Sequence, residues 1–337
     1  MYTAKRIPFR IIAPFAWRAV LFFAVYSFII CALYVWAGWT FLAVPFVPIA
    51  TIGTAVAFYI GFKSHSSYER LWEARRIWGS LVNASRSWGI LVMDYVSTLN
   101  TPVCYPPAEL YRMQQLLIYR HIAYLNALRI QLRSRPIWQE DVNIGTNIVE
   151  KQQAFNQGQL DKELSLFLHD DEVEYFVNRQ NPATQIIKCQ SKQLRELRAA
   201  GLISEYYHTD MQRMLTEFYS QQGACERIKS FPFPRQYAFF SYLFVMMFVG
   251  ILPFGLLTEM SKVSPAHLWL TVPFYTIIAW VFYTMEVVGD TSENPFENSI
   301  NDIPMTAICR NIEIDLREML GETELPQRVQ AVDNILM

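Results

Sequence analysis

The sequence has few charged residues for its length, and it has none between Ala19 and Phe62. Charged residues make up 18% of the 337 residues, against about 25% in a soluble protein. Because 29 basic residues face 30 acidic ones, the chain has no overall field for binding nucleic acid. Only 13 glycines and 52% hydrophobic residues exclude collagen-like and disordered chains. The composition is that of a membrane protein.

The sequence also lacks the motifs of common cofactor and metal enzymes. It has no glycine-rich nucleotide loop, no G-x-S-x-G turn and no H-E-x-x-H motif. Its 5 cysteines form no C-x-x-C pair, which predicts buried reduced thiols, and its 5 histidines have no metal-ligand spacing. The acidic run at 169–174 is more simply a helix start than a metal cluster. We therefore expect no enzyme activity, no cofactor and no bound metal.

Four uncharged stretches are long enough to cross a bilayer, which takes about 20 residues of helix. We place these spans at 17–37, 45–62, 236–258 and 263–285. Lysine and arginine gather before the first span, after the second and before the third, so both termini and the middle section should be cytoplasmic. The predicted organisation of this multi-pass cell-membrane protein is 1–62 with two spans, 63–235 as a helical cytoplasmic domain, 236–288 with two spans, and 289–337 as a cytoplasmic segment.

The second span carries two rows at helical spacing. Small residues recur at Gly53, Ala57 and Gly61, which allows close approach of another helix. The row one position on holds Thr54, Phe58 and Phe62. In an oligomer around a central axis, one row could face neighbours and the other a pore. The predicted spans contain no carboxylate or lysine, which argues against an ion-driven transporter and favours a hydrophobic constriction.

The middle section has the pattern of polar helices. A helix over 108–135 carries five arginines against one acid, and we expect acidic helices to pair with this face, although anionic lipid or nucleic acid are alternatives. Segment 138–161 is polar and has the least structural signal. Asn181-Pro182 predicts a helix start and Gly201 a helix end. The fold class is therefore an all-α membrane protein.

Two long stretches resemble the bestrophin family of ion channels, in its bacterial-type branch. The first is IGFKSHSSYERLWEARRIWG at 60–79, directly after the second span. The second is ENPFENSINDIPMTAICRNIEIDL at 293–316, which is similar to the family segment that begins with NPF. The four spans and helical middle section agree with this family, so the resemblance covers nearly the whole chain.

The resemblance implies a homopentamer in the lipid bilayer with one axial pore for small monovalent ions. Its hydrophobic neck would fall on Thr54, Phe58 and Phe62, where the family usually has an aliphatic residue in place of the threonine. A second aperture follows an X-Pro helix start in the family, which points here to Ala183 or Ile186. Chloride and other anions are the expected ions by resemblance, and cations stay possible because phenylalanine rings present a negative face and a positive edge.

Animal members of the family bind Ca²⁺ through an acidic run after the NPF motif. Here that run has only two acids, Glu297 and Asp302, and Glu297 stands where the family has glycine. Since Ca²⁺ takes six to eight oxygen ligands, we expect neither a Ca²⁺ site nor Ca²⁺ gating.

Two other hypotheses remain beside the channel. The chain could be a membrane-anchored scaffold or sensor whose cytoplasmic helices bind a partner without conduction. It could also be a secondary transporter, which four spans and the lack of a buried charge disfavour.

Overall fold

A computed structural model describes residues 1–4, 9–99, 105–134, 158–231, 233–292, 294–299, 302–332 and 334–337. Within these residues the regular structure is helical, and the only β-type pairs are isolated bridges. The α-helices are α1 (Phe9–Trp36), α2 (Phe46–Tyr95), α3 (Pro107–Arg133), α5 (Asp170–Val177), α6 (Pro182–Ala199), α7 (Glu205–Ser230), α8 (Arg235–Ser261), α9 (Thr271–Thr291) and α10 (Met305–Met319). Short 3₁₀ helices are η1 (Thr40–Leu42) and η2 (Pro265–Leu270).

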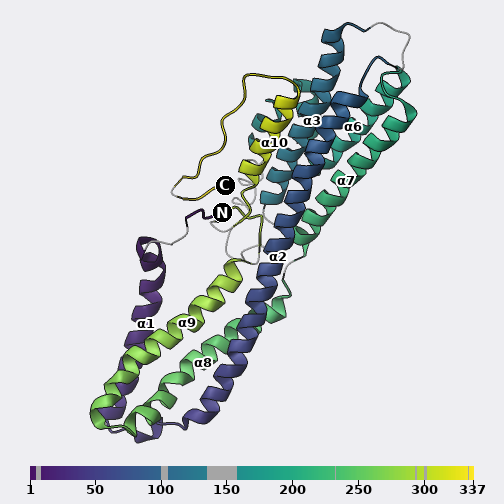
Figure 1. Ribbon diagram of the computed structural model, residues 1–337. Helices are drawn as coiled ribbons and strands as arrows, with labels where there is room; N and C mark the ends of the chain where they lie inside the picture. Colours follow the sequence, from purple (N-terminus) through teal and green to yellow (C-terminus); the bar gives the residue numbers. More distant parts are fainter. Residues whose placement is uncertain are drawn as a thin grey trace. The chain divides into compact units, whose positions relative to one another are not determined.

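The chain forms two compact units, which we describe separately (Figure 1). The membrane unit comprises Ala4–Leu71 and Pro232–Asn294, and the polar unit comprises Met1–Thr3, Trp72–Phe231 and Pro295–Met337. Four helical segments are long and apolar enough to cross a membrane: Ala16–Trp36, Thr40–Tyr95, Arg235–Ser261 and Pro265–Asp290. The prediction of an all-α protein with four membrane-spanning helices is confirmed.

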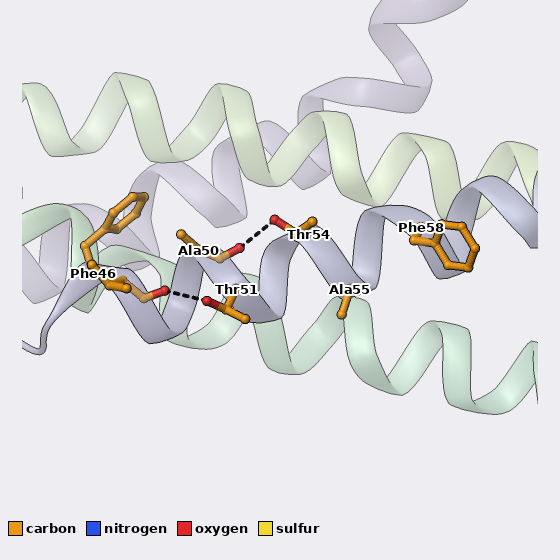
Figure 2. Close-up of a pocket in the computed structure, with 7 residues that line it drawn as sticks. Phe46, Ala50, Thr51, Thr54, Ala55 and Phe58 are labelled. Carbon is orange, nitrogen blue, oxygen red and sulfur yellow. Dashed lines mark hydrogen bonds between the residues drawn. The ribbon is translucent and has the colours of Figure 1, made fainter.

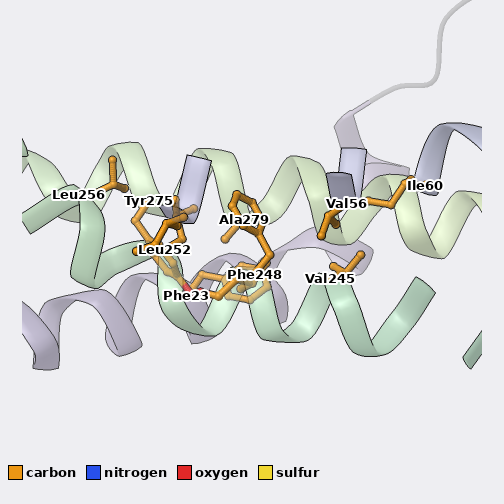
Figure 3. Packing of buried hydrophobic residues seen from close by; sticks show 11 residues of the cluster. Phe23, Val56, Ile60, Val245, Phe248, Leu252, Leu256, Tyr275 and Ala279 are labelled. Carbon is orange, nitrogen blue, oxygen red and sulfur yellow. Dashed lines mark hydrogen bonds between the residues drawn. The ribbon is translucent and has the colours of Figure 1, made fainter. Parts of the chain in front are cut away.

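The membrane unit has a core of aliphatic and aromatic side chains from α1, α2, α8 and α9 (Figure 3). Helix α9 packs against both α1 and α8. At the centre, the ring of Phe23 lies 6.2 Å from that of Tyr275, and Phe248 lies 4.7 Å from Phe282. Buried hydroxyls bond to helix carbonyls, as Tyr275 does to Val249 at 3.1 Å. Such bonds satisfy polar groups that would otherwise lie unpaired in hydrocarbon.

In the polar unit, α3 packs against α6, α7 and α10. Helix α2 continues past the membrane unit and buries Trp78, Leu81, Trp88 and Val92 here. The predicted helix ends are present: Asn181 Oδ1 accepts the Thr184 amide at 3.0 Å at the start of α6, and Gly201 follows its end with φ of +73°. Both chain ends lie in this unit, since the Thr3 amide donates to Asn334 O at 2.8 Å (Figure 1). The prediction for segment 138–161 falls largely outside the described residues.

Candidate functional site: the exposed row of helix α2

Helix α2 has a buried side and an uncovered side within the membrane unit. At 100° per residue, seven exposed positions fall within a sector roughly 80° wide. They are Val47, Thr51, Thr54, Phe58, Phe62, His65 and Glu69, which we call the exposed row. The opposite side is buried against the unit's own core at Ile49, Gly53, Val56, Ile60, Lys63 and Ser67. One chain therefore covers one side of α2 and leaves the exposed row without a partner from the membrane unit's core.

The two phenylalanines are the largest apolar groups of the exposed row. Phe58 is 79% exposed and Phe62 is 52% exposed, although the centroid of the Phe62 ring lies 6.2 Å from that of Tyr237, with the two rings tilted. Towards the start of the helix the surface is hollowed, and its lining includes Phe46, Ala50, Thr54 and Phe58 (Figure 2). The sequence prediction that Thr54, Phe58 and Phe62 share one face agrees with this geometry, and their place at a pore neck stays a prediction.

The threonines of the row use their hydroxyl hydrogens within α2. Thr54 Oγ1 donates to Ala50 O and Thr51 Oγ1 donates to Val47 O, both at 3.0 Å (Figure 2). Each side chain thus presents a methyl group and an oxygen that can still accept a hydrogen bond. Thr51 and Thr54 are consequently the two weakly polar members of an otherwise apolar row between Val47 and Phe62.

The small-residue row drifts around the helix. A Cβ atom placed on Gly53 would lie 2.6 Å from Phe248 Cε2, so Gly53 is where α8 approaches α2 closely. Each step of four residues turns the side-chain direction by about 40° around the helix axis. Ala57 and Gly61 therefore point away from α8 and are exposed. A Cβ on Gly61 would meet no atom within 4 Å. Gly53 thus packs inside the chain, whereas Ala57 and Gly61 lie on the flank beside the exposed row.

The candidates for the cytoplasmic aperture are buried in the polar unit. Ala183 is 0% exposed and Ile186 is 1% exposed, on the side of α6 that belongs to the unit's core. A side chain already enclosed by its own chain cannot line an opening between copies. The prediction that a helix starts at Asn181-Pro182 is confirmed. Ala183 and Ile186, however, lie on the side of α6 that faces the core of its own chain, which disfavours both as pore-lining groups.

A buried ion pair in the membrane unit was missed from the sequence. Lys63 Nζ lies 2.5 Å from Glu286 Oε1, and Ser241 Oγ donates to Glu286 Oε2 at 2.5 Å. The side chains of Lys63 and Glu286 are 3% and 5% exposed. Each residue directly follows a predicted span, 45–62 or 263–285, and these spans themselves hold no charge. The pair contradicts only the expectation that no charge is buried. Lysine and serine each bind one oxygen of the Glu286 carboxylate, so this buried acid has a counter-charge and a hydrogen-bond donor.

Two buried arginines of the 108–135 helix have acidic partners, as expected. Arg120 Nη2 lies 2.5 Å from Glu172 Oε1 of α5, and Arg129 Nη2 lies 2.8 Å from Glu163 Oε1. The acidic run at 169–174 therefore begins a helix and supplies a counter-ion. No group of three metal-ligating side chains occurs among the described residues. These pairs neutralise part of the basic face that motivated the scaffold hypothesis.

His121 of the same helix is a core residue of the polar unit. Its Nε2 lies 2.9 Å from Ser85 Oγ, and its ring lies 4.4 Å from that of Phe218. Burial lowers the pKa of His121 to about 3, because a charged imidazolium would lose its hydration there. This histidine is therefore neutral at ordinary pH and has no role at the exposed row.

The fold and the exposed row define a class: a four-span helical membrane protein whose second span leaves one apolar face uncovered. The profile described as bacterial/fungal bestrophin protein matches residues 10–318. The chain belongs to this bestrophin family, which confirms the expectation drawn from residues 60–79 and 293–316.

Named relatives extend over most of the chain. YneE of Escherichia coli strain K12, a voltage-dependent anion channel-forming protein, is 28% identical over 306 residues, 90% of this chain and 87% of the relative. A Mesorhizobium japonicum protein of the same description is 27% identical over 89% of this chain and 83% of its own. A crystal structure of a bacterial bestrophin homologue from Klebsiella pneumoniae has a TM-score of 0.74 at 24% identity, covering 91% of this chain and 98% of that chain.

The crystal structure shows that the fold is shared, and the family places the chain among membrane proteins of the channel type. The expectation that it is not an enzyme is confirmed by this family.

Proposed function

We propose that this protein is a homopentameric channel of the cell membrane that passes small monovalent ions, anions among them. In the proposal, five copies of α2 surround one axis, and Thr54, Phe58 and Phe62 of each copy form a hydrophobic neck. The main observation behind this proposal is the exposed row of α2. A long, mostly apolar helix face must be covered by lipid, by a second chain or by a pore that dewets.

Two further features support this arrangement. Ala57 and Gly61 lie on the flank of the exposed row, where small side chains let a neighbouring α2 approach. The relatives are named as anion channel-forming proteins, and the positive edges of phenylalanine rings can stabilise an anion. Both termini would be cytoplasmic, because four spans return the chain to its starting side and arginine and lysine gather there. The channel would open without Ca²⁺.

The aperture at the cytoplasmic exit is not assigned to Ala183 or Ile186 in this proposal. Both side chains are buried within one polar unit, which favours a constriction elsewhere. The neck on α2 is therefore the constriction on which the proposal depends.

The test is a recording from the purified oligomer in a planar bilayer under a KCl gradient. We expect discrete openings and a reversal potential displaced towards the chloride equilibrium potential, with and without a Ca²⁺ chelator. A native mass measurement on the same sample should give five chains. A silent bilayer with the oligomer confirmed as inserted would contradict the channel. Reversal on the potassium side would contradict anion passage, and openings only in Ca²⁺ would contradict Ca²⁺-independent gating.

A further inference from the structure

The buried side of α2 changes character directly after Phe62. Its buried positions within the membrane unit are first apolar and then polar: Ile49, Gly53, Val56 and Ile60 are followed by Lys63 and Ser67. Lys63 lies about 140° and Ser67 about 180° around the helix from the centre of the exposed row. The buried polar groups of this side therefore begin one residue beyond the phenylalanines of the row and point away from it.

These two polar groups link α2 to α9. Lys63 Nζ donates to Glu286 Oε1 at 2.5 Å, and Ser67 Oγ donates to Gly289 O at 2.8 Å. A Cβ atom placed on Gly289 would lie 3.6 Å from Lys63 Cγ, so the two helices are in direct contact at this level. Ser241 of α8 donates to the other oxygen of Glu286. The Glu286 carboxylate therefore joins three helices immediately beyond the exposed phenylalanines.

An ion pair fixes the rotation of a helix more sharply than apolar packing does. Hydrophobic contact is non-directional, whereas a buried ammonium group needs its carboxylate partner in place. Phe58 lies at the centre of the exposed row and Phe62 about 40° from it. A rotation of α2 by a few tens of degrees would therefore change which of the two rings points to a common axis.

We infer that Lys63 is a positioning residue for the neck: its ion pair with Glu286 fixes the rotation of α2 that turns Phe58 and Phe62 towards the pore axis. The inference rests on the proposed function, because it needs an axis lined by α2. Registry is the best attested role of buried ionic groups, which often stabilise a protein no more than apolar residues of similar volume do. Removing both charges together should therefore free the rotation of α2 without unfolding the membrane unit.

The experiment records unitary current amplitudes in planar bilayers in symmetric KCl, together with the melting temperature of the same sample. Wild-type protein should show one main amplitude. The double variant Lys63→Met and Glu286→Leu should show a second amplitude that differs by about twofold or more, because a rotated α2 changes the width of the neck. Its melting temperature should stay near the wild-type value. The double replacement removes one charge of each sign, so the net charge of the chain does not change.

A second double variant, Lys63→Met and Glu286→Gln, should give the same result, since glutamine keeps the volume of glutamate and can still bond to Ser241. Lys63→Arg is the rescue variant: its guanidinium group can donate to Glu286, and the single wild-type amplitude should be kept. The matched control is Lys262→Gln and Glu259→Gln, an ion pair of the same types at 2.7 Å whose side chains are 63% and 40% exposed. This control should leave the amplitude unchanged.

The single wild-type amplitude in both double variants would overturn the inference, and so would a second amplitude in the control. Failure of both double variants to assemble would also overturn it, because the ion pair would then hold the fold and not the rotation of α2. If alanine at Phe58 and Phe62 changes the conductance but the double variants do not, the inference fails while the proposed function stands. If the wild-type protein never opens, the proposed function fails first.

Discussion

Replacing Phe58 and Phe62 together by alanine should raise the unitary conductance by about threefold or more, because a wider and less apolar constriction dewets less readily. The two rings are the bulkiest groups of the exposed row and are largely uncovered in one chain. Their removal leaves the core of the membrane unit intact, since neither residue belongs to its buried cluster. The measurement is single-channel amplitude in planar bilayers at fixed KCl concentration.

The matched control for this pair is Phe22→Ala. Phe22 is an exposed phenylalanine on α1, with 64% of its surface uncovered, and it lies outside the exposed row. Its replacement should leave the amplitude unchanged, while Phe58→Trp should reduce it. Equal amplitudes in wild-type protein and in the double alanine variant would remove both phenylalanines from the ion pathway.

Replacing Glu286 by glutamine should destabilise the protein by about 3–5 kcal/mol, the usual loss when one partner of a buried ion pair is removed. Lys63 would keep a neutral amide oxygen and one acidic partner, Asp290, whose nearest oxygen is 3.6 Å away on a side chain that is 65% exposed. Ser241 would also lose its carboxylate acceptor. The measurement is the melting temperature of the detergent-solubilised protein, and we expect a decrease of several degrees.

The controls use a second ion pair and an apolar replacement. Glu259 pairs with Lys262 at 2.7 Å on a surface where the two side chains are 40% and 63% exposed, so Glu259→Gln should cost less than about 1 kcal/mol. The double variant Lys63→Met and Glu286→Leu should recover much of the stability, because no unpaired charge stays buried. Equal melting temperatures for Glu286→Gln and Glu259→Gln would contradict the burial of the pair.

Much of the fold could be predicted because its signals are local. A long stretch without charge specifies a membrane-spanning helix, and Asn181-Pro182 and Gly201 specify the two ends of α6. The exposed row was also within reach, since Thr54, Phe58 and Phe62 recur every four residues and such spacing places side chains on one face. The spacing did not show how the side-chain direction changes along a row of residues four apart. Gly53 packs against α8 inside the chain, whereas Gly61 is exposed beside the exposed row.

Tertiary pairings were beyond the sequence. Lys63 and Glu286 are 223 positions apart, and each directly follows an uncharged stretch, so each was taken as the end of a span. The structure buries both together instead. The burial of Ala183 and Ile186 was beyond the sequence for a related reason, because a helix start fixes where α6 begins but not which side packs against α3 and α7.

The most direct test of the central claim is thiol modification of Phe58→Cys during a bilayer recording. A charged, membrane-impermeant methanethiosulfonate reagent should irreversibly reduce the current of this variant, because the side chain would face ions and water at the axis. The recordings use a background in which Cys104 and Cys189 are replaced by serine, and this background should not respond, since Cys31, Cys225 and Cys309 are buried. Phe22→Cys should not respond either, because it would face lipid. A current through Phe58→Cys that stays unchanged, with the cysteine shown to be unmodified, would contradict a pore lined by the exposed row of α2.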